Sequence, residues 1–289
     1  MKPLRKLFLV LFLGLLIYGN YNGYFDEAIE YSGEVVKDFK KEENLQEIPV
    51  DCDDCISIAN WNIQTFGKTK WAKEEVKGKI LNVLPYYDII FIQEIREKSG
   101  ESFDELCLEL NDEYDCIISS RAGRSTSKEQ YGVIYRKDIT VERVIDYNLD
   151  ADANDFWERP PLRVDFIVDE YSFSAYNIHI KPDDVLEEFG SLERLVEKED
   201  HKETDNVILL GDLNADGFYY DEDKNELFLD YEWVIDDSMD TTVAKSDNTY
   251  DRIIMSDNMY RDYESMGVYK NVVKEVSDHY LVWVQIDID

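Results

Sequence analysis

The chain has 289 residues, of which 44% are hydrophobic and 13% aromatic, and this composition excludes an intrinsically disordered protein. The length allows one large domain or two small ones. The formal net charge is -33, and this charge taken alone argues against DNA or RNA as a partner, because proteins that neutralise phosphates are usually basic. Two alternatives stay open: the acid is spread over a solvated surface, or bound divalent cations reverse the sign at one site.

The N-terminus combines three cations with an apolar run. Lys2, Arg5 and Lys6 precede the apolar segment 7–18, which is typical of an export signal. The run is shorter than the roughly 20 apolar residues that a membrane span needs. No clear small-residue cleavage site follows, so residues 1–20 form either a signal peptide or an uncleaved signal anchor. We expect a secreted or extracytoplasmic protein, with a membrane tether as the alternative.

Residues 21–55 are predicted to be an acidic linker with one marginal helical pattern. From residue 56 to 289, short apolar runs alternate with polar stretches, which predicts one layered α/β domain. The runs predicted to be strands are 56–59, 89–92, 133–135, 171–180, 207–210, 253–255 and 281–286. Two amphipathic patterns predict helices, one that ends at Pro85 and one that follows Pro182, with Asp183 or Asp184 as its N-cap.

The four cysteines are Cys52, Cys55, Cys107 and Cys116. Export permits disulfides, and four cysteines allow three full pairings, among which the sequence cannot select. Two buried thiols at Cys107 and Cys116 are as compatible with the pattern as a bridge. The Cys52-x-x-Cys55 pair has no second pair at matching spacing, so it is no zinc signature.

Polar residues gather where the predicted strands meet loops, which is where sites on sheet proteins form. Two of the three histidines lie at such places, whereas His201 lies in a charged stretch and is expected at the surface. The residues at the strand ends are Asn62, Gln93, Glu94, His179, Asp212, Asn214, Tyr250, Asp251, Asp278 and His279.

This set suits the hydrolysis of a phosphodiester bond. Two histidines, each oriented by a carboxylate, can supply the base and the acid, and amides can donate to phosphate oxygens. A Glu with an Asn and an Asp favours Mg²⁺ or Mn²⁺ over zinc. Asp212 and Asn214 lie two apart on a segment predicted to be extended, so we expect them to face the same way; a turn with an Asx cap is an equal alternative.

Eight segments occur in an order that resembles one known family. They are Ile58 to Gly67, Tyr87 to Arg96, Gly123-Arg124 with Lys128 to Tyr131 and Val133 to Arg136, Ile178-His179, Leu210 to Ala215, Asp240 to Thr242, Tyr250 to Ile253 and Ser277 to Tyr280. Together they resemble the endonuclease/exonuclease/phosphatase superfamily, most closely its deoxyribonuclease I family, over about residues 56–286. The resemblance implies a four-layer α/β (α+β) sandwich in which two packed, mainly antiparallel mixed sheets are flanked by helices.

The resemblance also implies a role for each matching position. The catalytic divalent cation, Mg²⁺ or Mn²⁺, would be held by Asn62, Glu94 and Asp278. Glu129 would orient His179, Asp251 would orient His279, and Asp212 with Asn214 would position water and phosphate. Which histidine is base and which acid stays open. The residues that would contact DNA are Gln64, Arg96, Arg124, Thr242 and Tyr250. Arg96 has the alternative of a surface ion pair, and Arg252 is assigned to structure.

Two departures from the family pattern bear on function. Ser127 stands where the family has an aromatic residue, so we expect a weaker or altered grip on DNA. Gly217 and Asn248 stand where the family has a pair of bridged cysteines. Structural Ca²⁺ is plausible, and the acidic segment 146–155 offers one place for it, although a solvated loop explains that segment equally well.

Three classes of function follow, of which a secreted, monomeric DNA endonuclease is favoured by the segments 64–67 and 123–124. The second is a phosphodiesterase with the same core that acts on sphingomyelin, inositol phosphate or RNA. The third is a non-enzymatic binding domain, against which the intact acid and imidazole positions argue. The first predicts that five cations share the active face: Lys68, Arg96, Arg124, Lys128 and Arg159.

Overall fold

The computed structural model describes residues 45–289 except 125–126, 151–155, 200–204, 222–225 and 246. The predicted export segment, most of the predicted linker, His201 and half of the acidic segment 146–155 lie outside the described residues. Within the described ranges, no helix is both long enough and apolar enough to cross a membrane.

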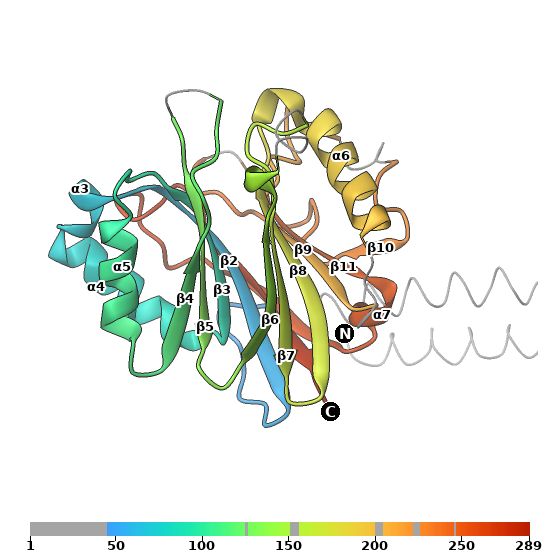
Figure 1. The fold of residues 1–289 in the computed structure, drawn as a ribbon, viewed down its shortest axis with the longest axis horizontal. Helices are drawn as coiled ribbons and strands as arrows, with labels where there is room; N and C mark the ends of the chain where they lie inside the picture. The colour runs from blue at the N-terminus through green and yellow to red at the C-terminus, as the bar shows by residue number, and fades with distance from the viewer. Residues whose placement is uncertain (1–44, 125–126, 151–155, 200–204, 222–225, 246) are drawn as a thin grey trace, which may run out of the picture. The chain divides into compact units, whose positions relative to one another are not determined.

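Two sheets form the core of the unit that begins at Gln46 (Figure 1). The seven-stranded sheet has the order β1-β12-β13-β2-β3-β5-β4, and the six-stranded sheet has the order β10-β11-β9-β8-β7-β6. The strands of the first are β1 Leu45–Gln46, β2 Cys55–Phe66, β3 Ile89–Ile95, β4 Tyr114–Ile118, β5 Gln130–Arg136, β12 Tyr263–Tyr269 and β13 Leu281–Asp287. The strands of the second are β6 Thr140–Asp146, β7 Leu162–Val168, β8 Tyr171–His179, β9 Val207–Asp212, β10 Tyr231–Trp233 and β11 Asp251–Ser256.

The pairing confirms the predicted sandwich of mixed, mainly antiparallel sheets. From β2 to β13, β2 with β3 and β8 with β9 are parallel, and the other paired strands are antiparallel. Parallel strands end on the same side, so the carboxyl ends of β2 and β3 lie together, as do those of β8 and β9. These four ends carry much of the candidate site.

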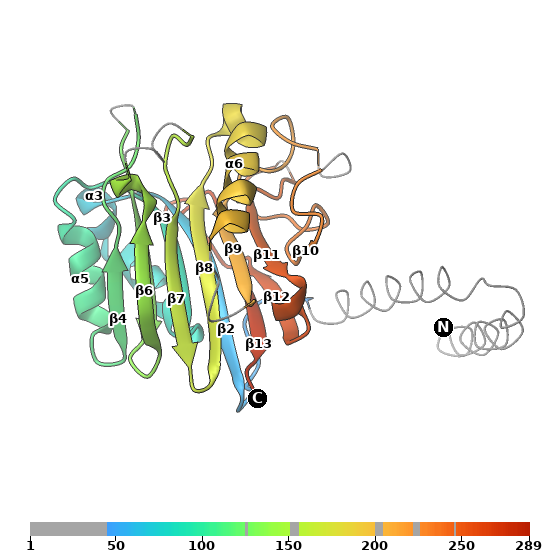
Figure 2. The same ribbon diagram turned by 45° about the vertical axis from the view of Figure 1, so that its right-hand side comes forward.

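Helices cover the outer face of each sheet (Figures 1 and 2). The helices are α3 Lys68–Trp71, α4 Glu74–Val83, α5 Glu101–Leu110, α6 Val185–Lys198 and α7 Asp257–Tyr260, with 3₁₀ turns at Leu84–Tyr86, Tyr147–Leu149 and Pro182–Asp184. Figure 1 shows α3, α4 and α5 on the side of the seven-stranded sheet and α6 on the side of the six-stranded sheet. The two helical layers and the two sheets make four layers.

Strand β2 shows how the sequence produces this layering. Its side chains alternate between the two faces: Ile56 and Ile58 join the cluster between the sheets, whereas Ala59, Trp61 and Ile63 join the cluster beneath α4 and α5. Both faces are buried, so the strand is apolar on both sides instead of showing an apolar and a polar face. A third cluster fills the space between the six-stranded sheet and α6.

Every predicted strand and both predicted helices are present, although β2 runs on to Phe66, well beyond 56–59. Strands β1, β4, β6, β7, β10 and β12 were not among the predicted runs, because they are short or carry polar residues within them. The predicted position of the N-cap is confirmed, but the expected side-chain hydrogen bond is not formed. Asp184 stands at the N-cap of α6, but its carboxylate bonds Lys181 Nζ at 2.5 Å and no side-chain cap bond forms.

The structure selects one cysteine pairing. Disulfides join Cys52 to Cys55 and Cys107 to Cys116. The second ties α5 to the edge strand β4, so the alternative of two buried thiols is wrong. Both bridges close short segments, with sequence separations of 3 and 9 residues.

Candidate active site

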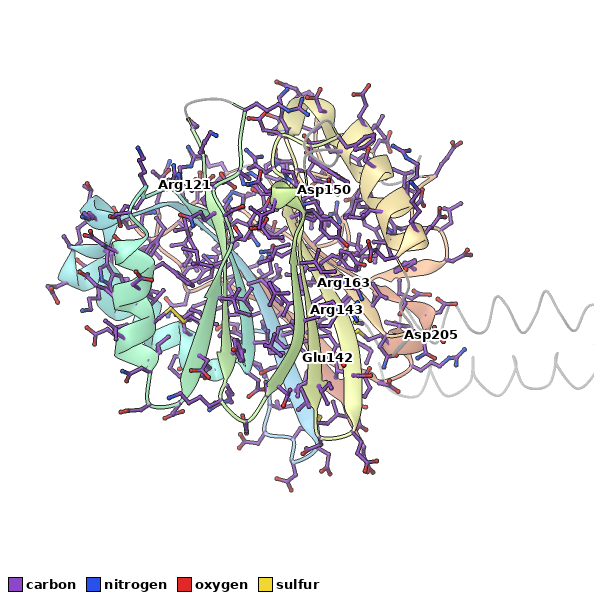
Figure 3. All side chains as sticks on the ribbon, in the orientation of Figure 1. Arg121, Glu142, Arg143, Asp150, Arg163 and Asp205 are labelled. Atoms are coloured by element: carbon purple, nitrogen blue, oxygen red, sulfur yellow. A yellow bond between two sulfur atoms is a disulfide. The ribbon has the colours of Figure 1, made fainter. Side chains whose placement is uncertain are left out.

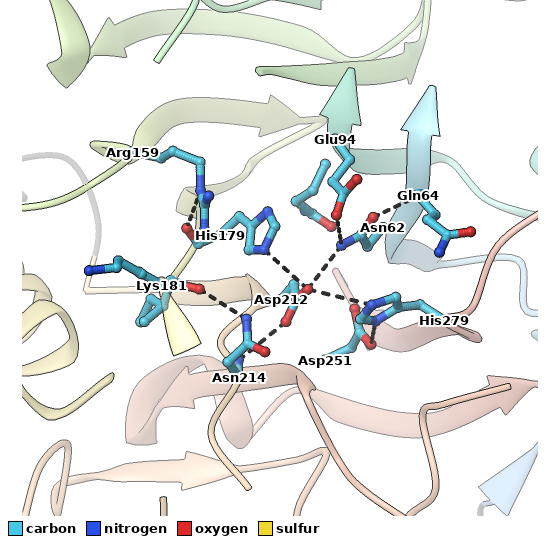
Figure 4. Close-up of polar contacts among 12 residues, drawn as sticks. Asn62, Gln64, Glu94, Arg159, His179, Lys181, Asp212, Asn214, Asp251 and His279 are labelled. Atoms are coloured by element: carbon cyan, nitrogen blue, oxygen red, sulfur yellow. Dashed lines mark hydrogen bonds and ion pairs between the residues drawn. The ribbon is translucent and has the colours of Figure 1, made fainter. Parts of the chain in front are cut away.

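The candidate site lies at the seam between the two sheets (Figure 4). The seven-stranded sheet contributes Asn62 from β2 and Glu94 from β3. The six-stranded sheet contributes His179 from β8, Asp212 from β9 and Asp251 from β11. All five residues are buried among strand ends, so their positions are set by sheet register.

One carboxylate oxygen is the focus of the site. Asp212 Oδ2 lies 3.4 Å from His179 Nε2, 3.6 Å from His279 Nε2 and 2.9 Å from Asn62 Nδ2. Behind the imidazoles, His179 Nδ1 is 2.7 Å from Glu129 Oε1, and His279 Nδ1 is 2.7 Å from Asp251 Oδ2. The two Nε2 atoms therefore face one shared space, and each Nδ1 is held by its own acid.

The Glu129–His179 pair is buried, and two arginines lie beside it. Burial alone would raise the pKa of Glu129, but the His179 imidazole, Arg159 and Arg96 outweigh it, so the pKa is lowered. Burial alone would lower the pKa of His179, but Glu129 outweighs it, so that pKa is raised. Glu129 therefore stays ionised and fixes the imidazole ring by its Nδ1.

The Asp251–His279 pair has a different environment. Burial would lower the pKa of His279, but Asp251 and then Asp212 raise it to about 10. No arginine contacts Asp251 among the described residues, in contrast to Glu129. The His279 imidazole therefore carries a proton at neutral pH in the metal-free chain.

Oxygen donors for a divalent cation lie beside this cluster. Glu94 Oε1 has one contact, to Asn62 Nδ2 at 3.4 Å, and Asp278 Oδ1 is buried without a hydrogen-bond partner among the described residues. Asp278 Oδ2 accepts a hydrogen bond from Gln64 Nε2 at 2.6 Å. Two carboxylates with free oxygen capacity and one amide fit Mg²⁺ or Mn²⁺, which keep several waters in their coordination shell.

The backbone of the site is strained. Gln64, Thr65, Glu94 and Asn214 all have positive φ, at 33°, 54°, 62° and 48°, although none is glycine. Such conformations are costly and concentrate at functional sites, where surrounding contacts hold them. The Glu94 carboxylate is one such contact, because its Oε2 accepts from the Thr65 amide at 2.7 Å.

The close packing of strands β8 and β9 requires a glycine at position 211. Its φ is 151°, and a Cβ there would lie 1.8 Å from the Ile178 carbonyl oxygen of the neighbouring strand. Only glycine lets β8 and β9 approach closely enough to bring His179 opposite Asp212. The glycine of the Gly-Asp-x-Asn motif therefore sets the distance between two site residues.

The prediction that Asp212 and Asn214 face the same way on an extended segment is wrong. Strand β9 ends at Asp212, and Asn214 adopts a left-handed conformation. The Asn214 amide donates to Asp212 Oδ1 at 3.2 Å, which is the alternative Asx turn, and its side chain donates to the Ile180 carbonyl at 2.9 Å. The Asx turn keeps Asp212 and Asn214 together, and the two-residue repeat of a strand does not.

The residues predicted to contact substrate are distributed around this centre. Gln64 bonds Asp278, and Arg96 lies 3.1 Å from Glu94 Oε2 and 3.8 Å from Glu129 Oε2, so Arg96 is more than a surface ion pair. Thr242 is buried and pairs with His279 in an isolated β-bridge. Tyr250 directly precedes Asp251, and Arg124 is exposed in the loop before β5.

Two further arginines serve the site. Arg159 Nε donates to the His179 carbonyl at 2.8 Å and lies 3.5 Å from Glu129 Oε1, and its NH2 is buried without a hydrogen-bond partner among the described residues. Arg121 (Figure 3) donates to the carbonyls of Arg96, Glu97 and Lys128, and so fastens the loop that carries Glu129 to the end of β3. The sequence pattern named Arg159 only as one of five cations and did not reveal Arg121.

Lys70, like Arg121, is a residue that the sequence analysis missed. Its Nζ donates to the carbonyls of Ile63 (2.9 Å), Gln64 and Val276 (2.6 Å). It therefore joins the strained 62–65 segment to the 276–279 segment that carries Asp278 and His279. Burial lowers the pKa of Lys70 to about 8, partly offset by Asp278 and Glu94.

The five predicted cations take different places. Arg96 and Arg159 meet at Glu129, and Lys128 immediately precedes it. Lys68 is exposed and forms ion pairs with Glu97 and Glu101. The positive charge near the site is therefore partly neutralised by acids of the chain itself.

In the described part of the acidic segment 146–155, Asp146 forms hydrogen bonds with nearby backbone amides. The Asp146 carboxylate accepts from the amides of Ser120 (2.6 Å) and Asn148 (3.1 Å). Across the described residues, no group of three or more His, Cys, Asp or Glu side chains is arranged to hold a metal ion. The structural Ca²⁺ site stays a prediction.

Comparison with known proteins agrees with this geometry. Residues 59–279 match the Endonuclease/Exonuclease/phosphatase family. Deoxyribonuclease-1 of Gallus gallus is 30% identical over 261 residues, which cover 80% of this chain and 92% of the relative. Deoxyribonuclease-1-like 1 of Cricetulus griseus is 32% identical over 255 residues, which cover 79% and 83%.

Solved structures share the fold. An endonuclease/exonuclease/phosphatase family protein from Bacteroides thetaiotaomicron superposes with a TM-score of 0.59 at 16% identity, over 81% of this chain and 98% of that one. TDP2 from D. rerio, complexed with single strand DNA product, gives a TM-score of 0.59 at 15% identity, over 81% and 99%.

The two-sheet sandwich and the family match define the class: the chain belongs to the endonuclease/exonuclease/phosphatase family. Within this class it is a phosphodiester hydrolase of the deoxyribonuclease I type, as its relatives show.

Proposed function

We propose that this protein is an exported, divalent-metal-dependent endonuclease that hydrolyses phosphodiester bonds in DNA. One observation carries the proposal: the Nε2 atoms of His179 and His279 converge on Asp212 Oδ2, at 3.4 and 3.6 Å. Each Nδ1 is bound to a buried carboxylate, so both Nε2 atoms face the same space. A scissile phosphate in that space would have a proton acceptor on one side and a proton donor on the other.

The proposed steps use atoms that the fold already aligns. One Nε2 accepts the proton of the attacking water, and the other Nε2 gives a proton to the leaving oxygen. Glu129 and Asp251 hold the rings in place and stabilise the charged imidazolium. Asp212 orients the water, and the Asn62 amide and the orphaned Arg159 NH2 are donors for non-bridging phosphate oxygens.

The cation would be held by Glu94 and Asp278, with the Asn62 amide close by. When bound, Mg²⁺ or Mn²⁺ stabilises the negative charge that develops on the phosphate oxygens. Arg96 lies between the two acids, 3.1 Å from Glu94 Oε2 and 3.8 Å from Glu129 Oε2, and would help to hold the Glu94 carboxylate in place.

DNA is the substrate best supported by the relatives, since both are named deoxyribonucleases. RNA, sphingomyelin and inositol phosphate are the alternatives for this catalytic core. The net charge of -33 makes long-range attraction of any polyanion weak, so local contacts at the site must supply the affinity.

Export is the third part of the proposal. The cationic and apolar N-terminal pattern at residues 2–18 and the two disulfides both fit a protein that leaves the reducing cytosol. The same N-terminal segment would serve as a tether if it is not cleaved. Mass spectrometry of the mature protein from the culture medium and from the membrane fraction distinguishes the two outcomes.

The test of the function is cleavage of supercoiled plasmid DNA in Mg²⁺, with and without Ca²⁺, over a range of salt. We expect nicking that EDTA abolishes and that His279→Ala reduces by at least about 100-fold. The variant Asp205→Asn, which changes an exposed acid, is the matched control and should cut normally. Absence of cleavage, cleavage that survives His279→Ala, or faster turnover of RNA, sphingomyelin or inositol phosphate in parallel assays would count against the proposal.

A further inference from the structure

Three buried amide side chains lie between the apolar core and the catalytic residues. They are Asn60 of β2, Gln93 of β3 and Asn177 of β8, which we call the amide cluster, and all three are 0% exposed. Gln93 Nε2 donates to Asn60 Oδ1 at 2.5 Å and to Asn177 Oδ1 at 2.6 Å. The proposed chemistry assigns no role to these amides.

The two-residue period of the strands places the amide cluster as a layer beneath the site. On β2, Asn60 lies two residues before Asn62, and on β8, Asn177 lies two residues before His179. Residues two apart in a strand face the same side, so these four side chains all point into the space between the sheets. The same step in the other direction leads from the two asparagines to members of the apolar core between the sheets, Ile58 and Ala175.

Gln93 joins the two halves of the site. Its bond to Asn60 stays within the seven-stranded sheet, whereas its bond to Asn177 crosses to the six-stranded sheet. Gln93 also stands immediately before Glu94, whose φ is 62°, and the pairing of β3 with β5 shifts register at this point. The Gln93 side chain therefore fixes β3 where its regular pairing ends, and connects it with the strand that carries His179.

Packing alone does not explain the amide cluster. Asn60 Nδ2, Gln93 Oε1 and Asn177 Nδ2 are buried with no hydrogen-bond partner among the described residues. Burial of a polar group without a partner destabilises a fold, and apolar side chains of similar size would fill the same space without this cost. The property that the amides add, and that apolar side chains lack, is a directional hydrogen bond from one sheet to the other.

We propose that Gln93 is a positioning residue. Its bond to Asn177 fixes the distance between the strand ends of the seven-stranded sheet, which carry the proposed ligands of the cation, and the end of β8, which carries His179. The inference rests on the proposed nuclease function. Since the amides are fully buried, they act on the reaction only through the residues next to them. A displacement of about 1 Å between reacting groups lowers a rate on the order of 100-fold.

The first test compares two substitutions of the same kind, Asn177→Ala and Asn60→Ala. Each removes a fully buried amide and one hydrogen bond of Gln93, so both should lower Tm by several degrees and by similar amounts. Only Asn177→Ala breaks the link between the sheets.

The readout is cleavage of a labelled DNA oligonucleotide in Mg²⁺ at a temperature well below the Tm of either variant. We expect kcat to fall by about 10- to 100-fold in Asn177→Ala and by less than about threefold in Asn60→Ala, with KM nearly unchanged in both. Equal losses of kcat in the two variants, or a loss that appears in KM instead of kcat, would overturn the positioning role.

A combined variant separates positioning from the filling of space. Asn60→Leu, Gln93→Met and Asn177→Leu together replace the amide cluster by apolar side chains of similar size. We expect the Tm of this variant to equal or exceed that of the wild type, because the unsatisfied polar atoms are gone. Its kcat should stay at least about tenfold below the wild-type value, because no bond joins the sheets at this point. Recovery of both Tm and kcat would show that the cluster only fills space.

Hydrogen exchange in EDTA distinguishes failure of this inference from failure of the proposed function, because it needs no catalysis. In Asn177→Ala, the backbone amides at the carboxyl end of β3, in the opposite sheet, should exchange on the order of tenfold faster by NMR. The control is Ser174→Ala, a buried substitution on the other face of β8, which should leave β3 unchanged.

The two measurements give distinct outcomes. Faster exchange in β3 of Asn177→Ala, in a protein whose wild type cleaves no phosphodiester, would support the Gln93 link and overturn the nuclease function. Cleavage of DNA by the wild type, with exchange in β3 that does not respond to Asn177→Ala, would do the reverse.

Discussion

Asp212 is the residue on which the chemistry depends most, because its Oδ2 is shared by two imidazoles and the Asn62 amide. We predict that Asp212→Asn lowers kcat by about 100- to 10,000-fold, because a neutral amide cannot orient the attacking water or interact with both imidazoles as the carboxylate does. The substitution preserves the shape of the side chain, so KM for DNA should change little. The measurement is steady-state cleavage of a labelled oligonucleotide in Mg²⁺.

The exposed Asp205 (Figure 3) supplies the control for this prediction, since Asp205→Asn removes a charge of the same sign away from the site. It should retain wild-type kcat. If Asp212→Asn keeps more than a tenth of the activity, the shared carboxylate is not a participant in the reaction.

The raised pKa of His279 makes the stability of the fold depend on pH. Its pKa is raised from 6.5 to about 10, chiefly because Asp251 and Asp212 overcome the effect of burial. A group with a raised pKa in the folded state stabilises the fold fully below pH 6.5, and this stabilisation is lost as the pH rises toward 10. In EDTA, the Tm of the wild type should therefore exceed that of His279→Gln by several degrees at pH 6, and the gap should narrow toward pH 10.

The comparison with His279→Gln reduces the contribution of the other groups that titrate in this range, such as Lys70. The readout is thermal unfolding followed by circular dichroism at intervals between pH 6 and pH 10. A difference in Tm that is constant over this interval would mean that the ion pair with Asp251 does not stabilise the metal-free protein.

At the scale of elements, the approach of β8 to β9 depends on the missing side chain of Gly211. A Cβ 1.8 Å from the Ile178 carbonyl cannot be accommodated without separating the strands. We predict that Gly211→Ala destabilises the protein by more than about 3 kcal/mol or prevents folding. Urea denaturation measures the effect.

The chain contains its own control for this prediction. Gly78 lies in the interior of α4, and a Cβ added there would meet nothing within 4 Å. Gly78→Ala should stabilise the protein by about 1 kcal/mol through helix propensity. Equal and small effects of the two substitutions would show that β8 and β9 adjust freely.

Lys70 joins two segments of the site by three carbonyl contacts. Without it, the strained 62–65 segment loses the contacts that hold it next to Asp278. We predict that Lys70→Met raises the Mg²⁺ concentration for half-maximal activity by about 10- to 100-fold, and that kcat at saturating Mg²⁺ falls less.

The exposed neighbour Lys73 is the matched control, and Lys73→Met should leave the Mg²⁺ dependence unchanged. An unchanged half-saturation in Lys70→Met would mean that the ammonium has no part in positioning the donors for the cation.

The elements also show which features the sequence could predict. Strands such as β9, with the run Val207 to Leu210, are apolar on both faces and bounded by polar residues, so their existence follows from local pattern. Strands β6 and β12 carry polar residues within them, and only pairing with neighbours defines them. The positions of Asn62, Glu94 and Asp212 at strand ends were visible in the sequence, because polar residues there interrupt apolar runs.

Contacts made by backbone atoms could not be predicted. Arg121 and Lys70 act by donating to carbonyls of segments distant in sequence, and no residue pattern marks a carbonyl as an acceptor. The turn at Asn214 was missed for a related reason, since a two-residue spacing is compatible with a strand and with an Asx turn. The disulfide pairing depends on the proximity of α5 and β4, which is a tertiary feature.

For the whole molecule, the net charge of -33 is the dominant electrostatic property. Repulsion among carboxylates opposes the compact state, and salt screens it, with a Debye length of about 10 Å at 0.1 M and about 3 Å at 1 M. We predict that Tm rises by several degrees between low salt and ~1 M NaCl at pH 7. KCl at the same ionic strength is the control and should act equally. A Tm that falls with added salt would show that specific ion pairs outweigh the general repulsion.

Each imidazole and its acid come from different sheets: His179 from β8 meets Glu129 before β5, and His279 before β13 meets Asp251 of β11. Neither dyad can assemble until the two sheets have packed face to face. A nascent chain, or one still threading through an export channel, therefore has no competent dyad. For the exported DNA endonuclease proposed above, this order of assembly would keep the catalytic dyads inactive inside the producing cell until the polypeptide has completed its tertiary structure.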